Sequence, residues 1–345
     1  MLVVTITEYT IDKYHASESI GGLAAGIFII GMLAGRLGSA RIIDHLQPKK
    51  VLLYGVIFSI IAIALYFAIT NLWVLMLIRF IHVIAFGFSS TATGTISSRI
   101  IPEDRKGEGI SYYGLSVRLA SAIGPFIGLV FNKHLGFKSI FAISLLSILV
   151  AFVLSIFIKK LPVLNNNHET KDQPRGIHAY LQKEALPISL VVILIGVAYS
   201  SVLSFLSIYS EKINLVTASS FFFLVFAIVT FITRPFTGKI YDNFGENKVM
   251  YPVLLSFTIG LIILGFTHTS MILLIAAAFI GFGYGTIVPT AQAIAIQQSS
   301  ASKIGLATST FYIFADFGAG MGPIILGIIT PVSYTHLTLP TKRIV

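Results

Sequence analysis

Long apolar runs alternate with short polar turns along nearly the whole chain. Ten of these runs are near or above the roughly 20 residues that an α-helix needs to cross a lipid bilayer. They lack the strict alternation of apolar and polar residues that is typical of strands in a membrane barrel. The pattern therefore predicts membrane-spanning helices at 19–35, 51–70, 72–98, 109–132, 137–158, 185–209, 216–237, 249–267, 270–297 and 305–330.

Composition agrees with an all-α integral membrane protein. Hydrophobic residues make up 55% of the chain and charged residues only 11%, whereas soluble domains carry about 25% charged residues. The chain has no cysteine, which excludes disulfides and thiolate metal sites. The sequence also lacks a nucleotide-binding P-loop, a G-x-S-x-G elbow and an H-E-x-x-H motif. We therefore expect neither an enzyme nor a bound cofactor or metal.

The basic residues lie mainly in alternate turns between the apolar runs. Sixteen Lys and Arg residues fall on one side, and the opposite turns hold four, namely Lys13, Lys133, Lys138 and Lys212. Because basic residues collect in cytoplasmic loops, the side with sixteen is expected to be cytoplasmic, and with it the polar linker at 159–184. The net charge of +10 leaves no basic face for nucleic acid once these residues are assigned to loops.

The chain repeats itself at an offset of 198 residues. Arg36 to Asp44 aligns with Arg234 to Asp242, and Gly124-Pro125 aligns with Gly322-Pro323. A long match at fixed offset indicates two copies of one structural unit. We expect two pseudo-symmetric helical bundles, at 1–158 and 185–330, with a binding site between them near the middle of the membrane.

The repeat also predicts helices that the chain does not hold in full. Projecting the second copy back places the start of the first helix before Met1, so that helix is expected to be truncated, with its outer end at 1–9. The segment 331–345 resembles nothing in the first copy, and we treat it as an anomalous tail. A complete protein would have six plus six helices, of which about 10–11 are present here.

These residues resemble the major facilitator superfamily. The signature loop of that family, G-x-x-x-D-[RK]-x-G-[RK]-[RK], is matched by Gly238 to Lys248 and, with Ala40 and Gln47 in place of glycines, by Ala40 to Lys50. The resemblance covers the whole chain except its tail. It implies cytoplasmic gate loops formed by Arg36, Arg41, Asp44, Arg234, Gly238, Lys239 and Asp242.

An Asp at the end of one helix can accept hydrogen bonds from the positive N-terminus of another. The resemblance implies that Asp44 faces the start of the eleventh helix near Gly305, and that Asp242 faces the start of the fifth near Gly107. Such a latch would hold the two halves together on the cytoplasmic side. The alternative is that these charges only fix the topology.

Arg79 and His82 lie three residues apart inside the fourth predicted helix, so they share one face. An Arg inside a span almost always faces a cavity or a partner, and His can exchange protons near neutral pH. The pair resembles the fourth-helix pattern of drug/proton antiporters. The alternative is that Arg79 binds backbone carbonyls of a neighbouring helix and holds packing only.

The fifth predicted helix contains Gly124, Pro125 and Gly128, which resemble the antiporter motif G-x-x-x-G-P-x-x-G-G. The resemblance implies a hinge and seal between the halves, repeated at Gly322 and Pro323. The alternative is ordinary packing of small residues between helices.

Two further ionisable residues, Arg118 and Asp316, occupy equivalent positions of the two copies, in the middle of predicted spans. An acid there is a candidate proton carrier or cation contact. The alternative is that a fixed polar neighbour neutralises each. The tyrosines Tyr112, Tyr113, Tyr284 and Tyr312 are candidates for stacking on an organic substrate, or for packing alone.

The resemblance implies secondary transport by alternating access. We expect proton-coupled efflux of a small organic molecule, such as a drug or metabolite, by a monomer in the plasma membrane. The same fold would serve an uptake symporter or uniporter. A non-transporting membrane sensor is a third interpretation.

Overall fold

The computed structural model describes residues 2–43, 46–159 and 179–337, and these residues are almost entirely helical. The helices are α1 (Leu2–Tyr14), α2 (Glu18–Ile42), α3 (Pro48–Leu65), α4 (Leu72–Ile100), α5 (Lys106–Leu135), α6 (Phe137–Phe157), α7 (Leu186–Lys212), α8 (Val216–Phe244), α9 (Glu246–Gly265), α10 (Ser270–Gln297) and α11 (Ile304–Leu337). Short 3-10 turns at Glu103–Arg105, Lys183–Ala185 and Ala301–Lys303 precede α5, α7 and α11.

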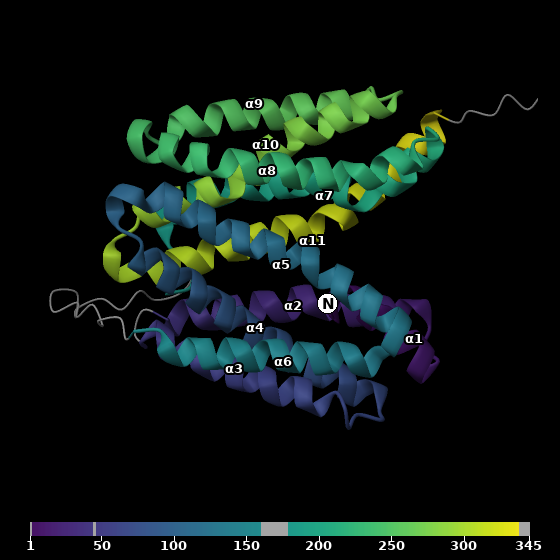
Figure 1. Cartoon of the computed structure of the whole chain (residues 1–345), viewed down its shortest axis with the longest axis vertical. Coiled ribbons are helices and arrows are strands. Elements are labelled where there is room, and N and C mark those ends of the chain that lie inside the picture. Colours follow the sequence, from purple (N-terminus) through teal and green to yellow (C-terminus); the bar gives the residue numbers. More distant parts are fainter. Residues whose placement is uncertain (1, 44–45, 160–178, 338–345) are drawn as a thin grey trace, which may run out of the picture.

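The helices form two bundles, α1–α6 and α7–α11, which meet along α5 and α11 in the middle of the molecule (Figure 1). Each bundle has its own hydrophobic core: Leu75 and Phe141 belong to a cluster in the first, and Phe222 and Ile280 to a cluster in the second. Between the bundles, α2 packs on α11 and α5 packs on α8. The two bundles expected from the repeat are therefore confirmed.

Local signals explain where several helices begin. The side chain of Asn71 accepts hydrogen bonds from the backbone N–H groups of Trp73 (2.8 Å) and Val74 (3.3 Å), which caps α4. A single glycine joins α5 to α6 and another joins α8 to α9. These are Gly136 at φ +73° and Gly245 at φ +83°, a backbone conformation that side-chain-bearing residues adopt rarely.

The ten predicted spans correspond to α2–α11, and the helices extend past most of the predicted ends. Hydrogen bonding continues into polar residues, where the apolar pattern has already stopped. α8 thus runs on from 237 to Phe244, and α11 runs on from 330 to Leu337, through the first part of the anomalous tail. Within the described residues, seven helices are long and apolar enough to cross a membrane.

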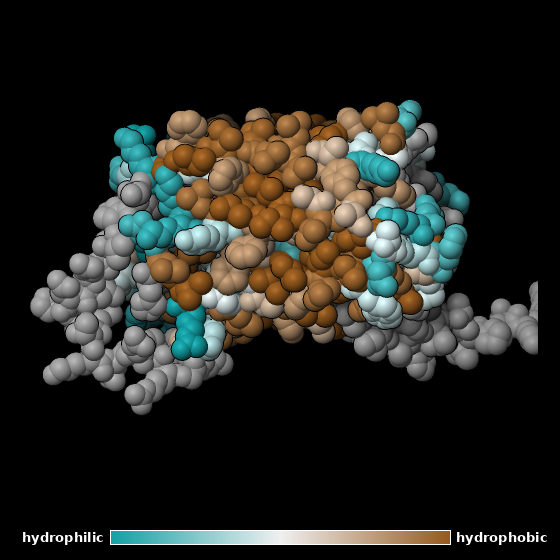
Figure 2. Space-filling model, turned by 90° about the horizontal axis from the view of Figure 1, so that it is seen from below, coloured by the Kyte–Doolittle hydropathy of each residue, from teal (hydrophilic) through white to brown (hydrophobic). Residues whose placement is uncertain are grey.

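The side chains around the outside of the bundle are mostly apolar. Figure 2 shows a broad hydrophobic band on the face in view, with hydrophilic residues toward both ends of the helices. Within the chain, Leu194, Phe231 and Leu255 are each more than half exposed. Such a continuous apolar surface is stable only against lipid or another apolar phase. The protein is therefore a multi-pass membrane protein.

Candidate functional site: a cavity and its closure between the bundles

One end of the molecule, where α6 ends at Phe157 and α7 begins at Leu186, is called the linker end below. Here Asp242 near the end of α8 meets the first turn of α5. Its carboxylate accepts hydrogen bonds from the backbone N–H groups of Gly107 (2.6 Å) and Glu108 (2.9 Å). These N–H groups have no partner within their own helix, and they carry the positive end of the helix dipole. Asp242 therefore ties the two bundles together.

Close backbone approach makes this contact possible. A Cβ atom built on Gly238 in α8 would lie 2.7 Å from the Cα atom of Glu108 in α5, so only glycine fits without moving a helix. Sequence analysis placed Asp242 opposite the start of the fifth helix, and the structure has it there. That the contact acts as a gate stays a prediction.

The equivalent contact in the other copy lies outside the described residues, because Asp44 is among those not described. The remaining loop residues Arg41 and Lys239 are exposed. Arg41 reaches the hydroxyl of Tyr180 at 3.4 Å. Both residues lie inside helices rather than loops, Arg41 in α2 and Lys239 in α8, near the linker end.

Arg234 lies one turn before Gly238 in α8 and is only 1% exposed. It donates a hydrogen bond from Nη1 to the backbone carbonyl of Ser111 in α5, at 2.7 Å. A Cβ on Gly114 would lie 2.8 Å from the same nitrogen. The guanidinium of Arg234 therefore packs directly on the backbone of the opposite bundle.

Arg36 in α2 forms an ion pair with Asp316 in α11, again across the two bundles. Its guanidinium carbon lies 4.3 Å from the ring centre of Tyr312, within the range of a cation–π contact. The hydroxyl of Ser309 donates to the backbone carbonyl of Arg36 at 2.7 Å. Arg36 is 5% exposed, so burial strengthens its attraction to the carboxylate.

The contacts of Arg36 and Arg234 are equivalent, as expected if a pseudo-twofold axis relates the two copies. Arg36 contacts Ser309 and Tyr312, while Arg234 contacts Ser111 and Gly114. Each residue of the first set is 198 positions from its counterpart in the second. The pseudo-symmetry expected from the repeat is thus visible at single contacts.

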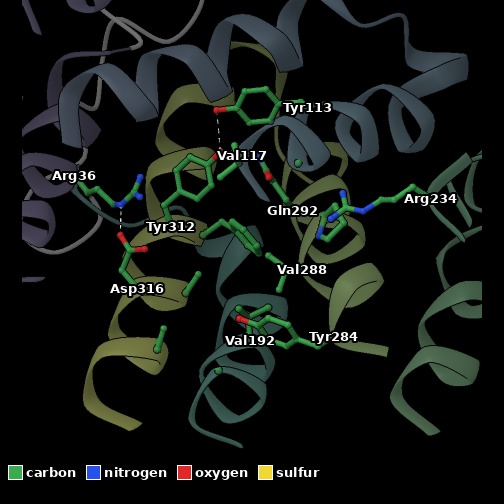
Figure 3. A pocket seen from close by; sticks show the side chains of 16 residues that line it. Arg36, Tyr113, Val117, Val192, Arg234, Tyr284, Val288, Gln292, Tyr312 and Asp316 are labelled. Carbon is green, nitrogen blue, oxygen red and sulfur yellow. Dashed lines mark hydrogen bonds and ion pairs between the residues drawn. The ribbon is translucent and has the colours of Figure 1, made fainter. Parts of the chain in front are cut away.

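A cavity of about 210 Å³ lies between the bundles beside both arginines. In Figure 3, Arg36 and Arg234 approach it from opposite sides, with Tyr312 and Gln292 between them. The Tyr312 hydroxyl accepts a hydrogen bond from Gln292 Nε2 (3.1 Å) and donates one to the Tyr113 hydroxyl (3.5 Å). The described residues that line it are Arg36, Tyr113, Gly114, Val117, Val192, Gly196, Arg234, Tyr284, Val288, Pro289, Gln292, Phe311, Tyr312, Ala315, Asp316 and Ala319.

The structure thus moves two expected gate residues to the cavity. The resemblance implies that Arg36 and Arg234 belong to the cytoplasmic gate loops, although the predicted span 216–237 already contains Arg234. They lie instead within α2 and α8, and their long side chains reach inward. Asp316 lies mid-span as expected, twelve residues after Ile304, or about 18 Å along α11. Arg118 lies in α5, and its side chain is outside what the structure describes.

Arg79 and His82 lie elsewhere, and neither is among the described residues that line the cavity. Arg79 is 1% exposed and donates from Nε to the backbone carbonyl of Ala24 in α2, at 2.6 Å. Nδ1 of His82 lies 3.1 Å from the hydroxyl of Tyr66. Both contacts stay within the first bundle, which favours the packing interpretation of this pair.

The small residues of α5 and α11 also have packing roles. Gly322 faces α7, where an added Cβ would lie 2.7 Å from Cβ of Ser200. That contact is within the second bundle, so at this position close helix packing is favoured over a seal between halves. Gly124 is half-buried and Gly128 buried. The side chains of Pro125 and Pro323 are outside the described set.

Sequence reasoning missed Gln292. It is one of two glutamines in the mostly apolar α10, and its repeat counterpart is Gly94. Both contact the same ring, since a Cβ on Gly94 would lie 2.8 Å from the Tyr312 hydroxyl. An amide well inside a predicted span was the signal. Of the four candidate tyrosines, Tyr113, Tyr284 and Tyr312 line the cavity, whereas Tyr112 is 49% exposed.

Curated proteins with a similar sequence include multidrug resistance proteins. The protein is 23% identical over 318 residues to the multidrug resistance protein MdtG of Dickeya zeae (strain Ech586), a match that covers 89% of this chain and 78% of that protein. It is also 23% identical over 298 residues to MdtG of Salmonella typhi, covering 84% of this chain and 73% of that one.

Solved structures share the fold at low sequence identity. The crystal structure of the human organic anion transporter MFSD10 matches with a TM-score of 0.72 at 15% identity, over 94% of this chain and 82% of that chain. The proton:xylose symporter XylE matches at 0.74 and 13%, over 96% and 84%. FucP in its outward conformation matches at 0.71 and 16%, over 96% and 90%.

The sequence model described as Major Facilitator Superfamily matches residues 1–331, almost the whole chain. This match and the shared fold together account for two pseudo-symmetric bundles with a cavity between them. The chain belongs to the Major Facilitator Superfamily and is a membrane transporter, not an enzyme.

Proposed function

We propose that this protein exports a small organic molecule across the plasma membrane by alternating access, in exchange for protons. The observation that carries the proposal is the Arg36–Asp316 ion pair, which joins the two bundles beside the cavity. A charge pair in this position links ionisation of Asp316 to closure of the linker end. The names of the MdtG relatives support the export direction.

The linker end is proposed to be cytoplasmic, because the basic turns collect there. The structure then corresponds to a state closed toward the cytoplasm, with contacts of α2 on α11 and of α5 on α8. Labelling tests the orientation directly, since the chain has no cysteine. A membrane-impermeant maleimide should label Lys248→Cys only from the cytoplasmic side and Met271→Cys only from outside; the reverse would invert the assignment.

Protonation of Asp316 would shift the equilibrium between the two states of the transporter. Neutral Asp316 loses its Coulomb attraction to Arg36, and a partner left without its counter-charge destabilises the closed arrangement by about 3–5 kcal/mol. A proton that arrives from outside therefore favours opening toward the cytoplasm. Substrate that binds there favours release of the proton, and each ligand shifts the equilibrium only by its unequal affinity for the two states.

Transport by the purified protein in proteoliposomes tests the proposal. The linker end is oriented outward, the lumen is acidified, and ethidium, naphthalenesulfonate and Nile red serve as probes. Export predicts that at least one probe accumulates in the lumen, and that a protonophore abolishes this. Accumulation only with the opposite gradient would mean uptake by symport. Accumulation of a probe that does not depend on the proton gradient would contradict proton coupling.

A further inference from the structure

We propose that the cavity selects amphipathic organic anions, whose acidic group binds between Arg36 and Arg234. This inference rests on the proposed transport function and names its substrate class. The first observation is the charge of the residues that line the cavity. The described lining residues include two guanidinium groups and one carboxylate, while the remaining polar groups, on Tyr113, Tyr284, Tyr312 and Gln292, are neutral amides and phenols.

Both arginines are held in place before any ligand arrives. Arg36 is 5% exposed and rests on the Tyr312 ring, and Arg234 is 1% exposed and donates one hydrogen bond to the Ser111 carbonyl. A guanidinium keeps its charge at every physiological pH and presents five donors in a rigid fork suited to carboxylates and sulfonates. Fixed donors lose little entropy when an anion binds.

The two halves differ in charge at one pair of equivalent positions. Asp316 in α11 pairs with Arg36, and the residue 198 positions earlier in α5 is Arg118, a base. The repeat therefore supplies a carboxylate to the α2–α11 contact and a cation to the opposite helix. Among the described residues that line the cavity, two guanidinium groups outnumber one carboxylate, and this excess of positive charge attracts anions and repels cations.

The opposite wall of the cavity suits an apolar body. Val192 and Val288 line it, and Tyr284 lies flat against Tyr199, with ring centres 3.6 Å apart and planes 12° apart. Figure 3 places Val192, Val288 and Tyr284 on one side of the two arginines. In a ligand with a flat ring and one acidic group, the ring would contact the apolar side chains and the acidic group would contact the guanidinium groups.

The acid of the substrate and the Asp316 carboxylate compete for the same guanidinium. In the structure Asp316 pairs with Nε of Arg36, while the Tyr312 ring covers one face of that guanidinium. An anion that binds Arg36 therefore weakens the ion pair that joins the two bundles.

Three probes of equal shape and different charge test this. Naphthalenesulfonate is a permanent anion, naphthylmethyltrimethylammonium a permanent cation, and naphthalenemethanol neutral. Binding to the purified protein is measured by equilibrium dialysis. The anion is expected to bind at least about tenfold more tightly than the cation, as a hydrogen-bonded charge pair implies. Equal binding of the two, or tighter binding of the cation, overturns the proposal.

Two substitutions should act in opposite directions. Arg234→Gln is expected to weaken binding of the anion about tenfold or more and to leave the neutral probe unchanged. Asp316→Asn removes the competing carboxylate and should strengthen binding of the anion, which a folding defect does not imitate. Lys138→Gln removes one positive charge from an exposed position and serves as the matched control. Weaker anion binding in Asp316→Asn would contradict the proposal.

Binding and transport separate the two proposals. If the anion binds selectively but no probe follows the proton gradient, the transport proposal fails and the substrate class stands. If the cationic probe is transported and binds more tightly, proton-coupled export stands and the substrate class fails.

Discussion

Arg36 and Arg234 occupy equivalent positions 198 residues apart, and each contacts the other bundle through a serine at equivalent positions. Ser309 donates to the backbone of Arg36, while the backbone of Ser111 accepts from Arg234. The two arginines differ in their other contacts. A proton on Asp316 would abolish its ion pair with Arg36, whereas the hydrogen bond from Arg234 to the neutral Ser111 carbonyl does not depend on a proton.

Removing the ion pair should open the linker end. Asp316→Asn leaves Arg36 buried without its carboxylate, which costs the closed state about 3–5 kcal/mol. Thr308 is fully buried beside Gly94 in the opposite bundle. Because the chain has no cysteine, maleimide labelling of Thr308→Cys from the linker side measures opening. We expect slow labelling in the parent and fast labelling with Asp316→Asn.

A charge exchange supplies the control for that experiment. Arg36→Asp combined with Asp316→Arg restores opposite charges at the same two helices, so labelling should slow again relative to either single change. A double variant that labels as fast as the single variants would show that the pair does not hold the end closed.

Asp242→Asn should weaken the second contact of the linker end. The amide keeps one acceptor oxygen but loses the charge that the start of α5 stabilises, an effect worth about 1–2 kcal/mol in a partly buried setting. Transport is expected to fall several-fold while the protein still inserts in the membrane. Asp104→Asn changes an exposed acid at the same end and should transport normally. Normal transport by Asp242→Asn would reject the latch.

Gly238→Ala should separate α5 from α8. The added methyl group would lie 2.7 Å from the Cα atom of Glu108, a backbone atom that cannot turn aside. We expect faster labelling of Thr308→Cys and a lower transport rate. Gly265→Ala is the matched control, because a Cβ at that position meets nothing within 4 Å. Equal behaviour of the two variants would argue that α5 and α8 approach less closely than described.

Arg79 and His82 should affect stability more than coupling. Arg79→Gln weakens a buried charged hydrogen bond to the Ala24 carbonyl, a loss of about 1.5–3 kcal/mol. Its Tm should fall, while the pH dependence of transport by either Arg79→Gln or His82→Gln stays that of the parent. A shifted pH profile in His82→Gln, with the profile of Asp316→Asn unchanged, would return proton coupling to the fourth helix.

Much of the fold follows from the sequence because lipid imposes simple rules. Apolar runs of sufficient length become helices, and the offset between Arg36 and Arg234 indicates two related bundles. The contact between Asp242 and the start of α5 was also expected, since the resemblance supplied both ends. Helix ends were less accurate, because α8 and α11 continue into polar residues where hydropathy gives no signal.

The cavity was harder to predict. Which residue meets Asp316 depends on how two bundles are rotated against one another, and periodicity within one helix contains no such information. The sequence therefore places Arg36 just past the end of a predicted span, and it does not show that Gln292 meets Tyr312. For Arg79 the sequence left two interpretations open, because a backbone carbonyl can satisfy an intramembrane charge as well as a substrate can.

The cavity is lined unequally. Of its sixteen described residues, Arg36, Tyr113, Gly114 and Val117 belong to the first bundle and the other twelve to the second. Cargo seated there would travel with α7–α11 as the bundles tilt. Substitutions along α7 and α10 would then change what is carried, while the charged contacts that set when the protein opens stay as they are.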